Sequence, residues 1–233
     1  AYEIRNCDWS SDVCSSDLKF LLLGSASIDL LRQSGETLAG RIAFVEMGGL
    51  SVTEIGADRS AQERLWLRGG FPESFLAADD AASAAWRVDF VRTYLERDVA
   101  QFGPRVPAET LRRLWTMLAH NQGGLLNAAR LASGLALSSP TVTRYIDLLV
   151  DLLLVRRLQP LHANVGKRLV KSPKTYVRDS GLVHSLLRLD TLDALLGHPV
   201  VGPSWEGFAI ETDRKSTRLN ASHSSVSRMP SSA

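Results

Sequence analysis

Apolar residues recur at three- and four-residue intervals through the middle of the chain, and this pattern predicts helices. Between residues 81 and 99 the apolar positions are Ala84, Val88, Val91, Leu95 and Val99. This spacing predicts an amphipathic helix with these residues on its inner face and with Arg87, Arg92 and Glu96 on its outer face. Gly103 and Pro104 end the pattern. A further helix follows, and the apolar residues of its inner face are Leu111, Leu114, Trp115 and Leu118.

The next segment has the pattern of a helix-turn-helix. A short helix is expected over Leu125–Ser133, with a turn at Gly134. Ser139 and Pro140 then supply an N-cap and a proline at the first helical position. The second helix has an apolar inner face formed by Val142, Tyr145, Ile146, Leu149 and Leu153. Its start is expected to expose Thr141, Thr143 and Arg144.

Two short strands, at residues 155–161 and 169–177, are expected to flank a turn at 162–168 and complete a winged helix over residues 105–178. No acidic residue occurs from Leu152 to Arg178, whereas seven residues there are basic. The sequence therefore predicts a nucleic-acid contact at this basic wing and at the start of the second helix. The residues assigned to this contact are Thr141, Arg144, Arg156, Arg157, Lys167, Arg168, Lys171 and Lys174. Alternatively, the basic side chains cover apolar surface or pair with acidic residues elsewhere, and winged helices also dock proteins.

The start of the chain has a strand-turn-helix pattern. The apolar run Phe20–Leu23 is stopped by Gly24 and Ser25, and a helical pattern follows. A unit of this kind lines the phosphates in P-loop ATPases, yet the 233 residues contain no G-x-x-x-x-G-K-[ST] motif. We therefore expect no ATP binding, no catalysis and no cofactor in this chain. Residues 41–45 and 50–55 are expected to be short extended or irregular pieces.

The two ends of the chain differ in composition from the rest. Residues 1–18 contain the near-repeat WSSD and CSSD, and residues 213–233 are rich in serine. Both are interpreted as unstructured, adapter-like sequence, with natural disordered tails as the alternative. Both cysteines lie in 1–18, so residues 19–212 need no disulfide, and a cytoplasmic location is expected. The net charge of +2 and the lack of a long apolar run argue against a membrane partner.

Four stretches together resemble prokaryotic AAA-type ATP-binding proteins that carry the C-terminal domain of unknown function 4143. The stretches are FLLLGSASIDLL with GETLAGRI, LRGGFPESFL, VRTYLERDV, and NVGKRLVKSPKTYVRDSGLVHSLL with WEGFAIE. The resemblance implies a mainly α chain with α/β remnants. The implied segments are an ATPase remnant (19–60), a helical linker (61–104), the winged helix (105–178) and the start of a restriction-endonuclease-like domain (179–212). It also implies ATP and Mg²⁺ binding, and possible homo-oligomers, in the full-length protein.

The same resemblance assigns roles to a few residues. Ser25 corresponds to a nucleotide-sensing position, and Arg41 to an arginine that reaches a neighbouring subunit's nucleotide. Their alternative roles are a helix cap and a surface ion pair. Asp179 is interpreted as an N-cap rather than a metal ligand, and Glu206 corresponds to the first acidic position of the nuclease-like fold. The expected function is that of a fragment of an ATP-binding AAA-type protein, and the alternative is a non-enzymatic winged helix that binds DNA or docks a protein.

Overall fold

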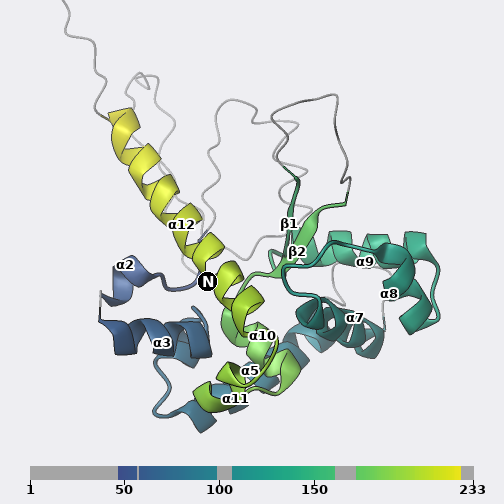
Figure 1. Ribbon diagram of the computed structural model, residues 1–233, viewed down its shortest axis with the longest axis horizontal. Helices are drawn as coiled ribbons and strands as arrows, with labels where there is room; N and C mark the ends of the chain where they lie inside the picture. Colours follow the sequence, from purple (N-terminus) through teal and green to yellow (C-terminus); the bar gives the residue numbers. More distant parts are fainter. Residues whose placement is uncertain (1–46, 57, 99–106, 161–171, 227–233) are drawn as a thin grey trace, which may run out of the picture.

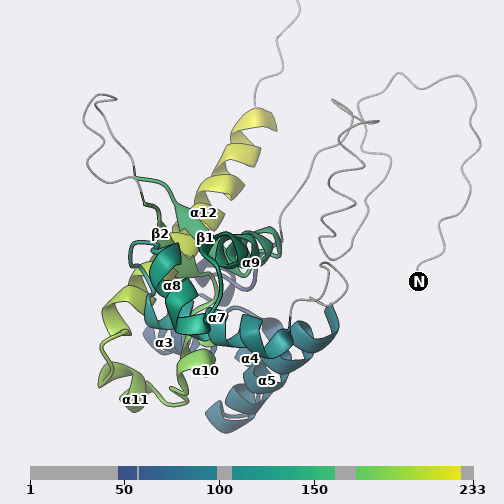
Figure 2. The same ribbon diagram turned by 90° about the vertical axis from the view of Figure 1, so that its right-hand side faces the viewer.

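The computed structural model describes residues 47–56, 58–98, 107–160 and 172–226, with the backbone alone beyond Asp213. The chain is mainly helical and contains a two-stranded antiparallel sheet (Figure 1). Helices α7, α8 and α9 lie at one end of the molecule, and α2 and α3 lie at the other, as the two perpendicular views show (Figure 2). The mainly α fold class predicted from the sequence is confirmed in this coarse form.

The first part of the described chain is a series of short helices. These are α2 (Val52–Ile55), α3 (Arg59–Arg68), α4 (Pro72–Phe75), α5 (Asp80–Thr93) and the π-helical turn η1 (Tyr94–Asp98). Aspartate side chains begin two of them, because Asp58 accepts the backbone N–H of Ala61 and Asp79 accepts that of Ala82. The prediction of a short extended or irregular piece at residues 50–55 is wrong. Ser51 and Glu54 form a capping box that begins a helix there.

Helix α5 and the turn η1 have the expected position, and the predicted inner residues Ala84, Val91 and Leu95 are buried. The prediction is wrong at Arg87 and Val88. Arg87 is 1% exposed, whereas Val88 is 54% exposed. The prediction assigned residues by polarity alone. Arg87 lies inside because its guanidinium donates to the backbone carbonyls of Leu67, Gly181 and Ser83.

The next helices are α7 (Ala108–His120), α8 (Ala128–Leu135) and α9 (Ser139–Asp151). The predicted inner face of α7 is confirmed, since its four apolar residues are buried. Two details at α8 and α9 differ from the prediction by a few residues. The N-cap of α9 is Ser138 rather than Ser139, and the left-handed residue that ends α8 is Ala136 rather than Gly134. Leu153 follows the end of α9 and is partly exposed, so Leu152 supplies the buried leucine there.

The strands β1 (Val155–Leu158) and β2 (Lys174–Val177) pair antiparallel, with Val155 opposite Val177. They are shorter than the predicted strands, and the whole predicted turn at 162–168 lies outside the described residues. An isolated bridge joins Leu125, between α7 and α8, to Lys174. Along the chain, helix α7 is therefore followed by the bridge at Leu125, by helices α8 and α9, and by the β1–β2 hairpin.

The last helices are α10 (Ser180–Leu187), α11 (Leu192–Leu196) and α12 (Val201–Val226). Helix α12 passes into the segment 213–233, for which we expected no regular structure. One hydrophobic cluster includes side chains of α3, α5, α7 to α11 and both strands. The predicted segments 61–104, 105–178 and 179–212 therefore share a core. Within the described residues, no helix is both long enough and apolar enough to cross a membrane.

Candidate functional site

Helices α8 and α9 form a packed pair whose starts are fixed by side-chain caps. The Asn127 side chain accepts the backbone N–H of Arg130 at the start of α8. The Ser138 hydroxyl accepts the backbone N–H of Thr141 at the start of α9. On α9, Val142, Ile146 and Leu149 are fully buried against the core. Because residues three and four apart share a face, this burial turns the intervening residues toward solvent.

The outward face of α8 and α9 carries polar and basic side chains. Thr143 and Arg144 are exposed on α9, and Arg130 is exposed on α8. The Thr143 hydroxyl donates to the backbone carbonyl of Ser139, so this side chain is held against its own helix. Neither Arg130 nor Arg144 has a carboxylate partner among the described residues. From Thr110 to Ile146 the sequence contains no Asp or Glu, so α8 and the start of α9 carry no negative side chain, whereas Asp147 and Asp151 lie in the second half of α9.

The basic residues of the hairpin lie in a different environment, because carboxylates of neighbouring helices neutralise them. Arg157 is 2.7 Å from Asp147 on α9. Lys174 is 3.0 Å from Glu206 on α12, and this carboxylate raises the pKa of the Lys174 ammonium, chiefly through their hydrogen bond. Arg156 and Arg178 both pair with Glu211, which also lies on α12.

Several residues assigned from the sequence lie outside the described part of the chain. These are Ser25, Arg41, Lys167, Arg168 and Lys171. Their assigned roles, in nucleotide sensing for the first two and in DNA contact for the others, stay predictions. Of the assigned DNA-contact residues that are described, the structure places Thr141 and Arg144 on α9, and it places Arg156, Arg157 and Lys174 on the hairpin.

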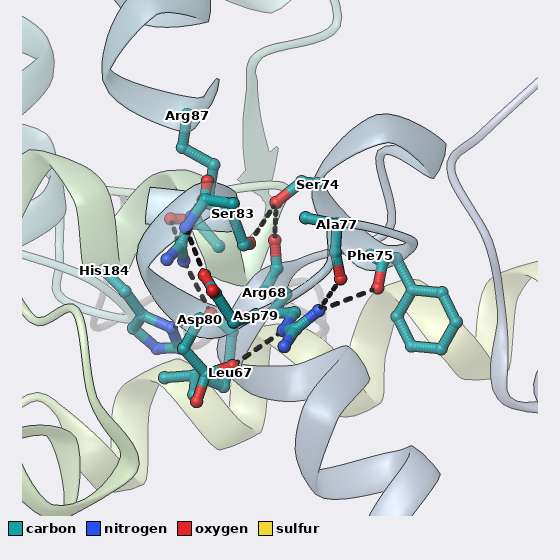
Figure 3. Close-up of polar contacts among 12 residues, drawn as sticks. Leu67, Arg68, Ser74, Phe75, Ala77, Asp79, Asp80, Ser83, Arg87 and His184 are labelled. Atoms are coloured by element: carbon teal, nitrogen blue, oxygen red, sulfur yellow. Dashed lines mark hydrogen bonds and ion pairs between the residues drawn. The ribbon is translucent and has the colours of Figure 1, made fainter. Parts of the chain in front are cut away.

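A second group of polar side chains lies in the core between α3, α5 and α10 (Figure 3). The Arg87 guanidinium is 2.7 Å from the Leu67 carbonyl and 3.2 Å from that of Gly181. Arg68 donates to the Asp80 carboxylate and to the carbonyl of Ala77, each at 2.7 Å. Burial lowers the pKa of Arg87, and the charge of Asp179 acts against this effect. These bonds join the end of α3 to α5, to α10 and to the turn after α4.

His184 extends this polar group toward α12. Its Nδ1 is 2.9 Å from the Leu67 carbonyl, and its Nε2 is 2.7 Å from the Ser204 hydroxyl. Because a carbonyl only accepts, Nδ1 carries the proton and Nε2 accepts from Ser204. The indole of Trp66 donates to the same hydroxyl at 3.0 Å. Burial lowers the pKa of His184 to about 4, so the ring is neutral at pH 7.

Asp179 acts as the N-cap of α10, as the sequence predicted, because its carboxylate accepts the backbone N–H of Leu182. It also accepts the N–H of Gly70, at 2.7 Å. Burial raises the pKa of this carboxyl, and these hydrogen bonds oppose the rise. Within the described ranges, no three His, Cys, Asp or Glu side chains gather in a way that could hold a metal ion.

The amphipathic pattern of the sequence did not predict this polar core. Arg87 and Ser83 lie on the buried face of α5, and periodicity treats such residues as solvent-facing. A signal was present in the sequence, because Arg68, Ser74, Asp179 and His184 all fall within the stretches LRGGFPESFL and RDSGLVHSLL. Each of them also bonds a backbone carbonyl or amide, and these groups carry no sequence signature of their own.

Comparison with known proteins places this region in a family. A family model described as a domain of unknown function, DUF8612, matches residues 59–193. Uncharacterized proteins of Mycobacterium bovis and Mycobacterium tuberculosis are each 53% identical to the chain over 193 residues. The match covers 83% of this chain and 43% of each relative, so the chain spans less than half the length of these relatives. No solved structure gives a significant match.

Proposed function

Because this chain belongs to the family of the domain of unknown function DUF8612, we propose that it is a non-catalytic, DNA-contacting part of a longer AAA-type ATP-binding protein. The curated relatives are more than twice as long as the matched region, which supports a role within a larger protein. The resemblance of LRGGFPESFL and the other quoted stretches supports the AAA-type assignment. The sequence supplies no phosphate loop, so we assign ATP and Mg²⁺ to other parts of that protein.

We propose that residues 107–178 form a winged helix. The order of elements supports this assignment: helix α7, a bridging strand position at Leu125, helices α8 and α9, and the β1–β2 hairpin. In a helix-turn-helix the second helix enters the major groove with its N-terminal residues on the base edges. In this chain that helix is α9, and its exposed start contains Thr143 and Arg144.

The observation that carries the DNA assignment is the exposed surface of α8 and of the start of α9, where no Asp or Glu occurs from Thr110 to Ile146. Arg130 and Arg144 are exposed there without a carboxylate partner in the described chain. DNA binding of this kind depends on cations that are free to replace the counterions of the phosphates. We propose that these two arginines contact the backbone, together with Lys167, Arg168 and Lys171, which lie outside the described residues.

A direct test is the binding of fluorescently labelled duplex DNA to the whole chain, followed by anisotropy at several salt concentrations. We expect weak binding with little sequence preference, and a loss of about tenfold in the variant Arg130→Glu/Arg144→Glu. The control variant Arg59→Glu/Arg92→Glu changes the net charge equally, at two strongly exposed arginines of α3 and α5. Equal effects of the two variants would contradict the assignment to α8 and α9.

Docking of another protein is the second candidate function. It is favoured by the ion pairs of Arg156, Arg157 and Lys174, which hold three of the proposed DNA contacts against carboxylates of the chain itself. If the same winged helix docks a protein, duplex DNA should fail to bind at low salt. We also propose that residues 179–212 begin a nuclease-like domain, and we assign no cleavage to this chain.

A further inference from the structure

We propose that the basic edge of the β1–β2 hairpin is a second phosphate-contacting surface, and that α12 closes it by pairing with its cations. The hairpin cations are Arg156, Lys174 and Arg178, and the closing residues are Glu206 and Glu211. The inference rests on the proposed DNA-contacting function. It adds a partner for the hairpin and a condition under which that partner can bind.

The contacts between α12 and the hairpin consist largely of charged side chains. Glu211 receives both Nε and Nη2 of Arg156, the latter at 2.9 Å. Its Oε2 also accepts Nη2 of Arg178 at 3.2 Å. Two guanidinium groups thus contact one carboxylate.

Helix α12 is seated close to the hairpin by a glycine. A methyl group added at Gly207 would lie 2.7 Å from the Gln122 side-chain nitrogen and 3.3 Å from the ring of Tyr176. Gln122 has little freedom to move away, because its amide bonds both the N–H and the carbonyl of Val177 in β2. Gly207 therefore allows α12 to pack close to β2, and this packing brings Glu206 and Glu211 within reach of the hairpin cations.

A phosphate group and a carboxylate compete for the same donors on these side chains. Arg binds either anion through two parallel N–H bonds, and Lys binds either as a point charge. The Lys174–Glu206 pair is about half exposed and is therefore weakened by water and salt. The Arg156–Glu211 and Arg178–Glu211 pairs are less exposed and are held more firmly. We expect DNA to replace Glu206 first, and to reach Arg156 and Arg178 only when α12 moves.

The experiment removes the two closing charges with Glu206→Gln/Glu211→Gln and measures duplex DNA binding as a function of salt. If α12 masks the hairpin, the affinity of the variant for DNA is about tenfold higher. A plot of the logarithm of the binding constant against the logarithm of the salt concentration then has a steeper slope. The increase corresponds to two or more additional phosphate contacts, at about 0.9 per contact. The control variant Glu73→Gln/Asp89→Asn changes the net charge equally at exposed sites on α4 and α5, which lie away from the hairpin (Figures 1 and 2). It should leave the salt slope unchanged.

Two further variants test whether the gain in DNA affinity comes from release of the hairpin cations, rather than from the change in net charge or from unfolding. Gly207→Ala keeps every charge but pushes α12 from Gln122, so DNA affinity should rise with it as well. Adding Lys174→Ala to Glu206→Gln should cancel the gain that Glu206→Gln gives alone. Thermal melting of each variant shows that the binding refers to folded protein.

The outcomes distinguish the inference from the proposed function. If Arg130→Glu/Arg144→Glu weakens DNA binding while Glu206→Gln/Glu211→Gln behaves like its charge control, the inference is wrong and the function stands. If no variant binds DNA, the DNA function is wrong, and elution from a heparin column decides the inference. Later elution of Glu206→Gln/Glu211→Gln than of its control would support a masked anion surface, and equal elution would overturn it.

Discussion

Arg87 joins three segments from inside α5. Its guanidinium donates to carbonyls of Leu67 and Gly181, which belong to α3 and α10, and to that of Ser83 in its own helix. Buried carbonyls that lose their donors destabilise a fold, because water cannot replace the lost bonds. The neighbouring Val88 is mostly exposed and has no such role.

We therefore predict that Arg87→Met lowers the free energy of unfolding by about 3 kcal/mol, whereas Val88→Ala changes it by less than about 0.5 kcal/mol. Urea denaturation of the two variants measures both values. The amphipathic pattern read from sequence predicts the reverse order, so a larger cost at Val88 would contradict the burial of Arg87.

His184 gives the fold a pH dependence. Its pKa is about 4 in the folded protein, whereas an unfolded histidine titrates near 6.5. Between these values the unfolded chain binds a proton that the folded protein does not bind, so stability falls as the pH falls. From pH 7 to pH 5 this contribution is about 2 kcal/mol.

The variant His184→Gln isolates this contribution, since Asp179, whose pKa is raised, acts in the opposite direction in both proteins. We expect the wild-type protein to lose about 2 kcal/mol more than the variant between pH 7 and pH 5, as measured by denaturation at each pH. Parallel pH profiles would show that the buried neutral ring has no such effect.

At the scale of elements, α10 packs against α3 at a point where only a glycine fits. A Cβ at Gly181 would clash with the backbone carbonyl of Arg68, and backbone cannot move aside as a flexible side chain can. Gly202, near the start of α12, has open space around it. The same substitution by alanine can therefore be compared at a crowded helical glycine, Gly181, and at an open one, Gly202.

We predict that Gly181→Ala destabilises the protein by about 3 kcal/mol through overpacking. Gly202→Ala should be neutral or stabilise it by up to about 1 kcal/mol, because alanine favours a helix over glycine. Thermal melting compares the two. Similar shifts in melting temperature would contradict the close contact between α10 and α3.

The helices were predictable where the inner face is purely apolar. Leu111, Leu114 and Trp115 of α7 are buried as their spacing predicts. The prediction failed at Arg87 and Val88 of α5, because Arg87 donates to the carbonyls of Leu67 and Gly181, which are distant in sequence. It also failed to anticipate the ion pairs of the hairpin, since Glu206 and Glu211 are separated from the strands by two helices.

At the scale of the whole molecule, one core connects the helices from α3 to α11, and the α8–α9 pair forms one end of it. The proposed DNA contact lies at that end, whereas α2 and α3 lie at the opposite end (Figure 1). Binding at α8 and α9 should therefore leave α3 unaffected. This separation gives an internal control within a single sample.

Hydrogen exchange of the whole chain, with and without duplex DNA at low salt, tests the central claim most directly. The claim predicts slower amide exchange in peptides that cover Ser139–Asp151, and unchanged exchange in peptides that cover Arg59–Arg68. Unchanged exchange in Ser139–Asp151 under conditions where DNA is bound would contradict it, as would protection confined to Arg59–Arg68.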